Sequence, residues 1–320
     1  MQAVAFDHFG GPEAIRLADR PTLEPRPGEV VIDVAAASVN PTDIMMLSGA
    51  QARMMVDLAP PYTAGMEFAG RVAQCGPGVN LGIGQAVVGV VNPRRPEGGA
   101  QAQQVRLPVA LVAPINETVG LIAAAAVPMN ALTAILCLEL SDLSRGQSVL
   151  VTGGAGAMGG FAIQLARQAG LRVLANGGDS DHSLLSQLGA DIVLPRDTGL
   201  EDALMAACPE GVDALIDAAL IGARLSHRVR SGGAAVALRA SHAIVDDRLR
   251  TFVVSVGKVL QEPDVDPSVT RNIERIARYI EDGTLTPRVA ANGVFALRHA
   301  SEAYRMAQRS GVRGRVLLVP

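Results

Sequence analysis

Three glycines lie at the spacing of a dinucleotide-binding loop. Gly153, Gly156 and Gly159 follow the short apolar run 149–151, and small apolar residues then recur at helical spacing as far as Gly170. Dinucleotide-binding sites contain a strand buried on both faces, a glycine turn and a helix in this order. The free N–H groups at the start of that helix bind the pyrophosphate. The pattern therefore predicts nucleotide binding, with an ordinary tight strand-to-helix turn as the alternative.

Residues that bind metals or form disulfides are few and scattered. Cys75, Cys137 and Cys208 are odd in number and far apart, so they predict neither a disulfide framework nor a Cys-x-x-Cys metal site. The histidines lie singly along the chain, at His8, His182, His227, His242 and His299. We therefore expect no metal site, and a reducing compartment such as the cytoplasm.

Composition excludes several kinds of partner. With 320 residues, of which 49% are hydrophobic, the chain is long enough for two domains with a large core. A formal net charge of −3 without a basic run, no Trp, three Tyr and six Phe give little surface for phosphates or stacked bases. Nucleic acid is not an expected partner.

No segment predicts a membrane anchor. Residues 1–11 lack the basic start of a secretory signal. The run 121–140 approaches membrane-spanning length, but Pro128, Asn130 and Glu139 interrupt it. We expect a pair of buried helices there.

The pattern of the chain changes near Asn116. Before it, apolar runs separated by Gly and Pro predict a mainly β unit, with strands at 3–6, 15–17, 30–36, 68–72, 86–91 and 105–107. After it, helices at 183–188, 200–208 and 223–229 alternate with strands at 192–194, 214–216, 234–238 and 252–256. This alternation predicts an α/β fold with a doubly wound parallel sheet. Two amphipathic helices, 269–280 and 300–307, and a strand, 315–319, close the chain.

Several short motifs, together with this layout, resemble the medium-chain dehydrogenase/reductase superfamily, and within it the zinc-free quinone oxidoreductase (zeta-crystallin-like) branch. They run nearly from end to end: ASVNPTD (37–43), PPYTAGMEFAG (60–70), GGAQAQQVRLP (98–108), MNALTA (129–134) and SGVRGRVLLVP (310–320). The resemblance implies a doubly wound (Rossmann) dinucleotide-binding domain, residues 125–266, inserted into a GroES-like mainly β domain of residues 1–124 and 267–320.

The resemblance also implies the chemistry. Zinc dehydrogenases of the superfamily bind metal through a cysteine and a histidine at the positions of Asn40 and Met66, so a zinc-free site is implied here. Without that Lewis acid, a quinone or an α,β-unsaturated carbonyl, which delocalises the incoming charge, is favoured over a simple ketone. Asn40 is implied to contact the nicotinamide ribose or the substrate oxygen, and Thr133 the cofactor or substrate. For each, a hydrogen bond within its own turn or helix is the alternative.

The cofactor is implied to lie along the glycine loop and the neighbouring strand ends. The implied contacts are Gly153, Gly156, Ala157, Met158, Gly159, Gly177, Asp179, Leu238, Ser241 and Arg309. No acid stands at Gly177, where NAD sites usually carry one, which leaves room for a 2′-phosphate that Arg309 would reach. The branch supplies a lysine and a tyrosine for that phosphate, but Asp181 or His182, and Pro195, take those places. NADP is favoured, with NAD as the alternative.

The leading hypothesis is an NADPH-dependent reductase of quinones or enones. Met45 stands where some enoyl-thioester reductases of the superfamily carry a tyrosine, and Tyr62 lies nearby, so we expect solvent to supply the proton. An enoyl-thioester reductase and a non-catalytic NADPH-binding sensor or adaptor are the alternatives. Relatives pair the sheet edge to which the run 251–256 is assigned, which predicts a homodimer.

Overall fold

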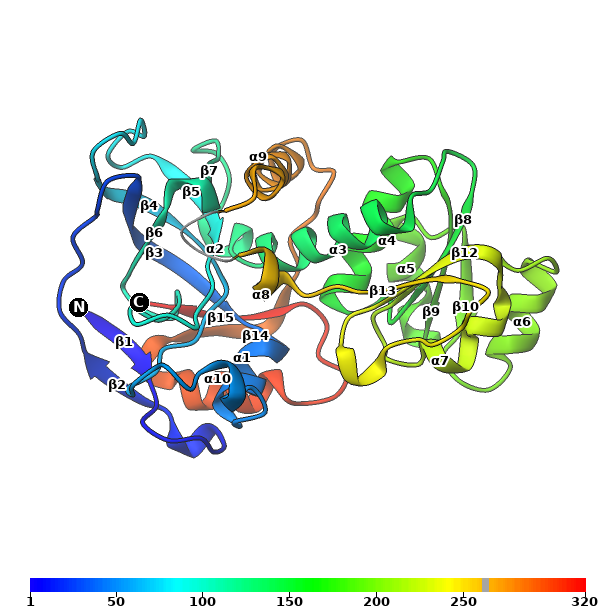
Figure 1. Ribbon diagram of the computed structural model, residues 1–320, viewed down its shortest axis with the longest axis horizontal. Helices are drawn as coiled ribbons and strands as arrows, with labels where there is room; N and C mark the ends of the chain where they lie inside the picture. The colour runs from blue at the N-terminus through cyan, green and yellow to red at the C-terminus, as the bar shows by residue number, and fades with distance from the viewer. Residues whose placement is uncertain (261–264) are drawn as a thin grey trace. The chain divides into compact units, whose positions relative to one another are not determined.

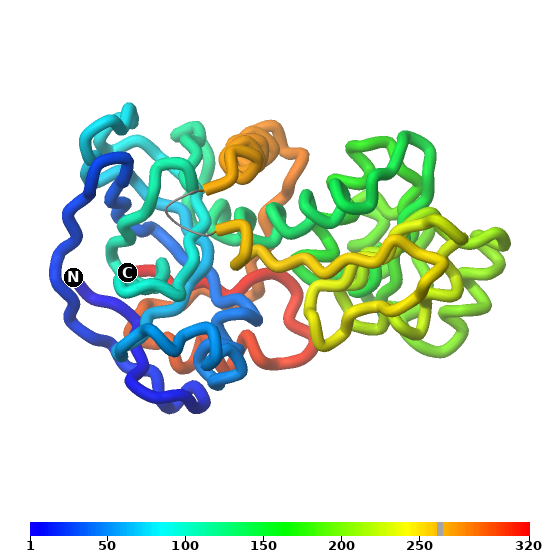
Figure 2. Tube along the Cα trace, viewed as in Figure 1, coloured from blue at the N-terminus to red at the C-terminus, as the bar shows by residue number. Residues whose placement is uncertain are grey.

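The computed structural model describes residues 1–260 and 265–320, which form two units (Figures 1 and 2). The first unit comprises Met1–Met129 and Gly257–Pro320, and the second comprises Asn130–Val256. The boundaries expected from the sequence are 124/125 and 266/267. The chain thus begins the first unit, builds the second and then returns to the first.

A parallel sheet of six strands organises the second unit, in the order β10-β9-β8-β11-β12-β13. Its strands are β8 (Ser148–Thr152), β9 (Arg172–Gly177), β10 (Ile192–Pro195), β11 (Val212–Asp217), β12 (Val229–Ala237) and β13 (Arg250–Val253). The strand order changes direction between β8 and β11, and doubly wound sheets bind ligands at the carboxyl ends of strands beside such a switch point. The predicted α/β fold is confirmed.

Four helices connect these strands: α4 (Ala157–Gln168), α5 (His182–Leu188), α6 (Leu200–Ala207) and α7 (Gly222–Leu225) (Figure 1). Short 3-10 turns lie at Asp179–Asp181, Ser226–Arg228 and Ala240–His242. Leu204 of α6 packs with Leu150 and Leu215 of the sheet in one apolar cluster. Gly170, just beyond α4, has a φ of 74°, in the left-handed region that often ends a helix.

The first unit contains a sheet in the order β14-β15-β3-β4-β5-β7, with β6 paired to β3. Its strands are β3 (Glu29–Val39), β4 (Glu67–Cys75), β5 (Ala86–Val90), β6 (Gln104–Pro108), β7 (Val112–Pro114), β14 (Val289–Ala296) and β15 (Arg315–Val319). A separate antiparallel pair joins β1 (Gln2–Ala5) and β2 (Arg16–Asp19). The mainly β character predicted for the first part of the chain is confirmed.

Helices of the first unit are α1 (Pro41–Leu47), α2 (Leu121–Ala124), α9 (Pro267–Glu281) and α10 (Ala300–Ala307), with 3-10 turns at Pro12–Ala14, Ala52–Met54, Val109–Leu111 and Leu297–His299. Helices α3 (Pro128–Ser141) and α8 (Val256–Val259) contain the unit boundaries. The predicted helix pair at 121–140 is confirmed as α2 and α3. Within residues 1–260 and 265–320, no helix is both long and apolar enough to span a membrane.

Some local predictions were wrong or incomplete. The strand expected at 252–256 lies at Arg250–Val253, because these residues pair one by one with the end of β12, and Val256 already begins α8. The helix expected at 223–229 is limited to α7 and a 3-10 turn, since Val229 pairs with Val212 in the sheet. Helix α1 and strand β14 were not predicted.

Candidate active site

A glycine turn joins β8 to α4. Gly153 follows the last residue of β8, and its φ of 64° lies in the left-handed region that favours glycine. A Cβ built on Gly159 would lie 2.4 Å from the Gly153 carbonyl oxygen, so the loop closes only with glycine at that position. Gly156, the N-cap of α4, has no side chain to accept from the first-turn N–H groups. This geometry fits a dinucleotide pyrophosphate, which backbone N–H groups and the positive end of the helix dipole would bind.

Side chains from both neighbouring strands hold this turn. Asn176, near the end of β9, accepts a hydrogen bond from Gly153 N through Oδ1, at 2.9 Å. Thr152 donates through Oγ1 to Asp217 Oδ1 at the end of β11, at 2.7 Å, and accepts from Ala219 N at 3.0 Å. The glycine loop is therefore fixed by the strands on either side of β8.

An exposed arginine flanks the end of β9, where a Rossmann site meets the adenosine ribose. Asp181 accepts hydrogen bonds from Gly178 N at 3.0 Å and from Arg196 Nη2 at 2.9 Å. The Asp181 side chain is 4% exposed, whereas that of Arg196, just beyond β10, is 52% exposed. A Cβ on Gly178 would lie 3.4 Å from Arg196 Nη2, so the guanidinium runs alongside this turn. It places a solvent-accessible positive charge next to Gly178.

In the first unit, buried polar side chains gather where β3 ends and α1 begins. We call them the buried polar cluster: Ser38, Asn40, Asp43, Glu67 and Arg315. Asn40 Nδ2 donates to Ser38 Oγ at 3.1 Å and to Glu67 Oε1 at 2.9 Å. Asn40 Oδ1 accepts from Arg315 Nη2, which also donates to Val39 O at 2.6 Å. The amide of Asn40 is therefore held from both ends within the first unit.

Asp43 gives the cluster a second carboxyl group. Its Oδ2 accepts from Asn40 N at 2.7 Å, and its Oδ1 accepts from Gly65 N at 3.0 Å. Burial raises the pKa of Asp43 to about 7, against the opposing effects of these two N–H groups and of Arg315. Burial also lowers the pKa of the Arg315 guanidinium, which Glu67 and Asp43 partly counteract. Because the pKa of Asp43 lies near 7, the net charge of the cluster changes near neutral pH.

Glu67 connects the cluster to helix α3. Its Oε2 accepts from Met129 N, the second residue of that helix, at 2.7 Å. A carboxylate at a helix N-terminus satisfies an N–H group without an intrahelical acceptor and interacts favourably with the helix dipole. Thr133 follows one turn later on the same helix and is 9% exposed.

Asn40 and Met66, which the family resemblance places at the positions of zinc ligands, both have buried side chains. Over the described ranges 1–260 and 265–320, no group of three or more His, Cys, Asp or Glu side chains is arranged to hold a metal ion.

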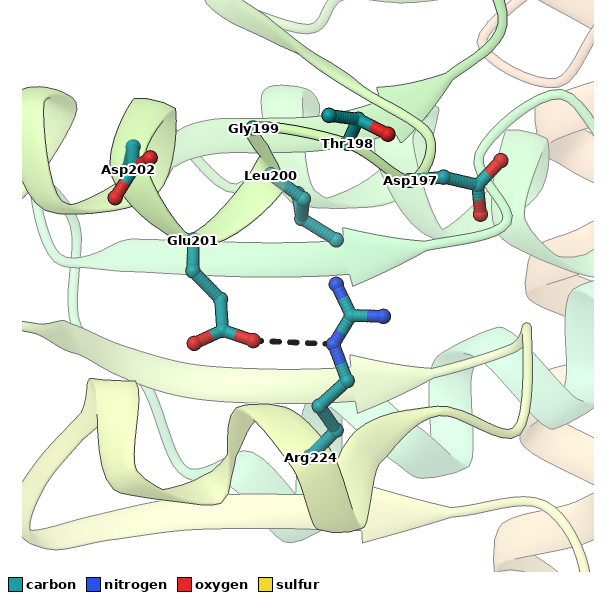
Figure 3. Close-up of a pocket in the computed structure, with 7 residues that line it drawn as sticks. All are labelled: Asp197, Thr198, Gly199, Leu200, Glu201, Asp202 and Arg224. Carbon is teal, nitrogen blue, oxygen red and sulfur yellow. Dashed lines mark hydrogen bonds and ion pairs between the residues drawn. The ribbon is translucent and has the colours of Figure 1, made fainter.

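A surface pocket of about 380 Å³ lies elsewhere in the second unit (Figure 3). Residues 197–202 and Arg224 line it, and Arg224 Nε donates to Glu201 Oε1 at 3.1 Å. Three of the lining side chains are carboxylates, which disfavours an anionic nucleotide. The predicted site residues are not among those that line this pocket.

Comparisons with known proteins bear on both units. The alcohol dehydrogenase GroES-like domain family matches residues 26–117, and the zinc-binding dehydrogenase family matches residues 188–318. A chloroplast envelope quinone oxidoreductase homolog from Arabidopsis thaliana is 30% identical over 227 residues, which cover 68% of this chain and 68% of that protein. The chain belongs to the quinone oxidoreductase branch of the medium-chain dehydrogenase/reductase superfamily.

Two further relatives extend this match over the whole chain. The NADPH-dependent alkenal/one oxidoreductase of Arabidopsis thaliana chloroplasts is 27% identical over 329 residues, covering 100% of this chain and 80% of that protein. The structure of the quinone oxidoreductase from Coxiella burnetii matches with a TM-score of 0.85 at 26% identity, covering 100% of this chain and 99% of that one. The family resemblance inferred from the sequence is confirmed.

Most of the cofactor-binding residues predicted for this chain lie at one edge of the second unit. Gly153, Gly156, Ala157, Met158 and Gly159 form the glycine loop and the first turn of α4, Gly177 and Asp179 follow β9, and Leu238 and Ser241 follow β12. The strands are parallel, so their carboxyl ends share this edge. Thr133 also belongs to the second unit, whereas Asn40 and Arg309 belong to the first. The contacts of these residues with a cofactor or substrate stay predictions.

Sequence reasoning missed three residues that the structure brings to these sites. Asn176 directly precedes Gly177 and binds the glycine loop, but it was not among the predicted contacts. Arg196 directly follows Pro195, the residue that was compared with the branch's tyrosine. Glu67 lies within the quoted motif PPYTAGMEFAG, and the signal that could have revealed it is an acid in an otherwise apolar strand start.

Proposed function

We propose that this protein is an NADPH-dependent reductase that transfers a hydride to a quinone or to an α,β-unsaturated carbonyl compound. The observation that carries the proposal is the glycine turn between β8 and α4, beside the switch point of a doubly wound sheet. Membership of the quinone oxidoreductase branch supports the acceptor class. The relative named as an NADPH-dependent alkenal/one oxidoreductase supports both the cofactor and the activated double bond.

Each part of the chain has a defined task in this proposal. The N-terminal turn of α4 binds the pyrophosphate through backbone N–H groups and the helix dipole. NADPH, when bound, would supply the hydride from its nicotinamide ring. Asn40 and Thr133 are the proposed contacts that orient the nicotinamide and the acceptor, and water supplies the proton. A conjugated acceptor delocalises the developing charge, so the proposed reaction is independent of zinc.

Arg196 supports NADPH over NADH. The 2′-phosphate of NADPH would lie beside the end of β9, where the exposed guanidinium of Arg196 is held by Asp181. One contact to Asp181 leaves further N–H groups of the guanidinium to donate to a phosphate. Gly178 has no side chain at this turn, where the nearest atom to an added Cβ would be Arg196 Nη2 at 3.4 Å.

Loss of reduced nicotinamide absorbance tests the reaction. We expect the purified protein to oxidise NADPH with p-benzoquinones, 2-alkenals or cyclic enones. Preference for an enoyl thioester over all of these would favour the enoyl-thioester reductase. Bound NADPH that no acceptor oxidises would favour the sensor or adaptor.

Replacement of Arg196 tests the cofactor assignment. Arg196→Ala should raise the KM for NADPH about 10-fold or more and leave the KM for NADH unchanged, since charge-assisted hydrogen bonds to the 2′-phosphate are lost. Arg224→Ala is a matched control, because Arg224 is another carboxylate-paired arginine of the second unit and is 51% exposed. Equal changes in the two KM values for Arg196→Ala would contradict the assignment.

Assembly and location complete the proposal. β13 is at the edge of the six-stranded sheet, which supports a homodimer formed by pairing this edge with that of a second copy. A mass in solution equal to one chain at micromolar concentration would contradict it. Cys75, Cys137 and Cys208 are free thiols, which supports a reducing compartment such as the cytoplasm.

A further inference from the structure

Glu67 is a carboxylate whose two oxygens bind different elements of the first unit. The residue is fully buried. Its Oε1 accepts from Asn40 Nδ2 at 2.9 Å and from Ser38 Oγ, at the end of β3. Its Oε2 accepts from Met129 N at 2.7 Å, in the first turn of α3. The end of one strand and the start of one helix are thus joined through a single side chain.

The hydrogen-bond donors around Glu67 match the two acceptor oxygens of its carboxyl group. Asn40, Ser38 and Met129 all donate, and a carboxylate accepts at both oxygens. Arg315 supplies the balancing positive charge, and it reaches Asn40 from the other end of the amide. The amide of Asn40 is therefore fixed in one orientation, with its nitrogen toward Glu67 and its oxygen toward Arg315.

Both elements that Glu67 joins carry a proposed contact residue. Asn40 is bound directly, and Thr133 lies four residues after Met129, on the same face of α3. We propose that Glu67 is a positioning residue, which fixes the orientation of Asn40 and the start of α3 with the two oxygens of one carboxylate. This inference rests on the proposed reductase function, because Asn40 and Thr133 are the contacts that it positions.

Glu67→Gln tests the positioning role with little change in volume. One of the two oxygens becomes an NH2 group, which must face either Met129 N–H or the donors of Asn40 and Ser38. We expect kcat per bound NADPH to fall on the order of 10- to 100-fold, as for a contact displaced by about 1 Å. Hydrogen exchange at the start of α3 should accelerate in the same variant, whereas exchange in α4 should not.

Glu29→Gln is the matched control. Glu29 also begins a strand of the first unit and is mostly buried, with an ion pair to Arg106 at 3.1 Å. We expect this variant to lose thermal stability while keeping kcat per bound NADPH and the exchange of α3. An equal loss of kcat in both variants would show that Glu67 contributes only stability, and would overturn the inference.

The double variant Glu67→Gln with Asn40→Ala tests whether Glu67 acts through Asn40. We expect Glu67→Gln to lower kcat less in the Asn40→Ala background than in the wild-type protein, because coupled residues are not additive. Losses that simply multiply would overturn the inference. If the double variant does not fold, Ser38→Ala replaces Asn40→Ala in the same cycle, because Ser38 binds the same oxygen of Glu67.

The exchange measurement separates the two proposals. A wild-type protein that binds NADPH and reduces no acceptor contradicts the proposed function. In that case, the rate of hydrogen exchange at the start of α3 in Glu67→Gln still shows whether Glu67 stabilises the start of this helix. Unchanged exchange there contradicts the positioning role, even if the wild-type protein is an active reductase.

Discussion

The glycine loop of the second unit and the buried polar cluster of the first use different groups to hold their sites in place. The loop relies on backbone geometry, with a positive φ at Gly153 and an approach at Gly159 that excludes any side chain. The cluster relies on ionisable side chains, Glu67, Asp43 and Arg315, which are all buried. A backbone loop presents N–H groups without burying a charge. Burying a charged side chain costs free energy, which only ion pairs and hydrogen bonds with neighbouring groups offset.

This difference predicts how each region responds to change. A loop held by backbone geometry tolerates substitutions that cause no steric overlap with its atoms. It loses its conformation when a side chain is added where the backbone is closely packed. A cluster of buried charges tolerates little loss of a partner, because the remaining charge stays buried and unpaired. The comparison also predicts that pH affects the first unit more than the second.

The largest expected effect is the loss of Arg315. Arg315→Leu leaves Glu67 and Asp43 buried without their guanidinium, so we expect the free energy of unfolding to fall by about 3–5 kcal/mol. Chemical denaturation measures this loss. Arg71→Leu is the control, because the ion pair of Arg71 with Glu117 is half exposed and should contribute much less to stability. Similar losses in the two variants would contradict the contrast between buried and surface charges.

The second prediction concerns pH and Asp43. Burial raises the pKa of Asp43 from 3.8 to about 7, so the folded protein binds one more proton than the unfolded chain between these values. The stability from this group is complete below about pH 4 and is lost as the pH rises through about 7. Its slope approaches about 1.4 kcal/mol per pH unit, so about 2 kcal/mol should be lost between pH 5 and pH 7.

Asp43→Asn provides the reference for this measurement. Its amide does not titrate, so the part of the slope that belongs to Asp43 should disappear. The amide NH2 also faces Asn40 N–H or Gly65 N–H, so the variant should be less stable at pH 5. Denaturation midpoints of both proteins from pH 5 to pH 8 provide the test, and parallel curves would contradict the prediction.

The same contrast explains what the sequence could predict. The glycine loop was predicted because a turn that excludes side chains must repeat glycine at fixed spacing, and its strand and helix have their own periodicity. The helix pair α2 and α3 was predicted because Pro128 and Asn130 interrupt an apolar run. Patterns within a short window were sufficient in both cases.

The buried polar cluster could not be predicted in this way. Asn40 and Glu67 are 27 residues apart, and Asn40 and Arg315 are 275 apart, so no local pattern joins them. Their partnership depends on the pairing of β3 with β4 and β15, which sequence periodicity does not fix. Helix α1 was missed for another reason. Its signal, Asn-Pro-x-Asp, lay inside a region dominated by strands, although Asp43 accepts from Asn40 N in the manner of a helix start.

A third prediction probes the backbone loop. Gly159→Ala introduces a Cβ that would lie 2.4 Å from the Gly153 carbonyl oxygen and 2.9 Å from its carbon, both of which are backbone atoms. We expect overpacking to destabilise the second unit by about 1–3 kcal/mol and to abolish detectable NADPH binding by calorimetry. Gly120→Ala is the control, because its added Cβ meets no atom within 4 Å and its φ of −66° suits any residue. Normal NADPH binding by Gly159→Ala would contradict the proposal that this loop binds the pyrophosphate.

The smallest expected effect tests a side-chain hydrogen bond that joins β9 to this loop. Asn176→Ala removes the acceptor of Gly153 N, a hydrogen bond that should contribute about 1 kcal/mol. NADPH affinity should therefore fall about fivefold, because the loop keeps its glycine geometry and loses only one support. A fall as large as that caused by Gly159→Ala would show that side chains, and not backbone geometry, hold this loop. The second unit would then resemble the first, and the contrast between the two regions would no longer stand.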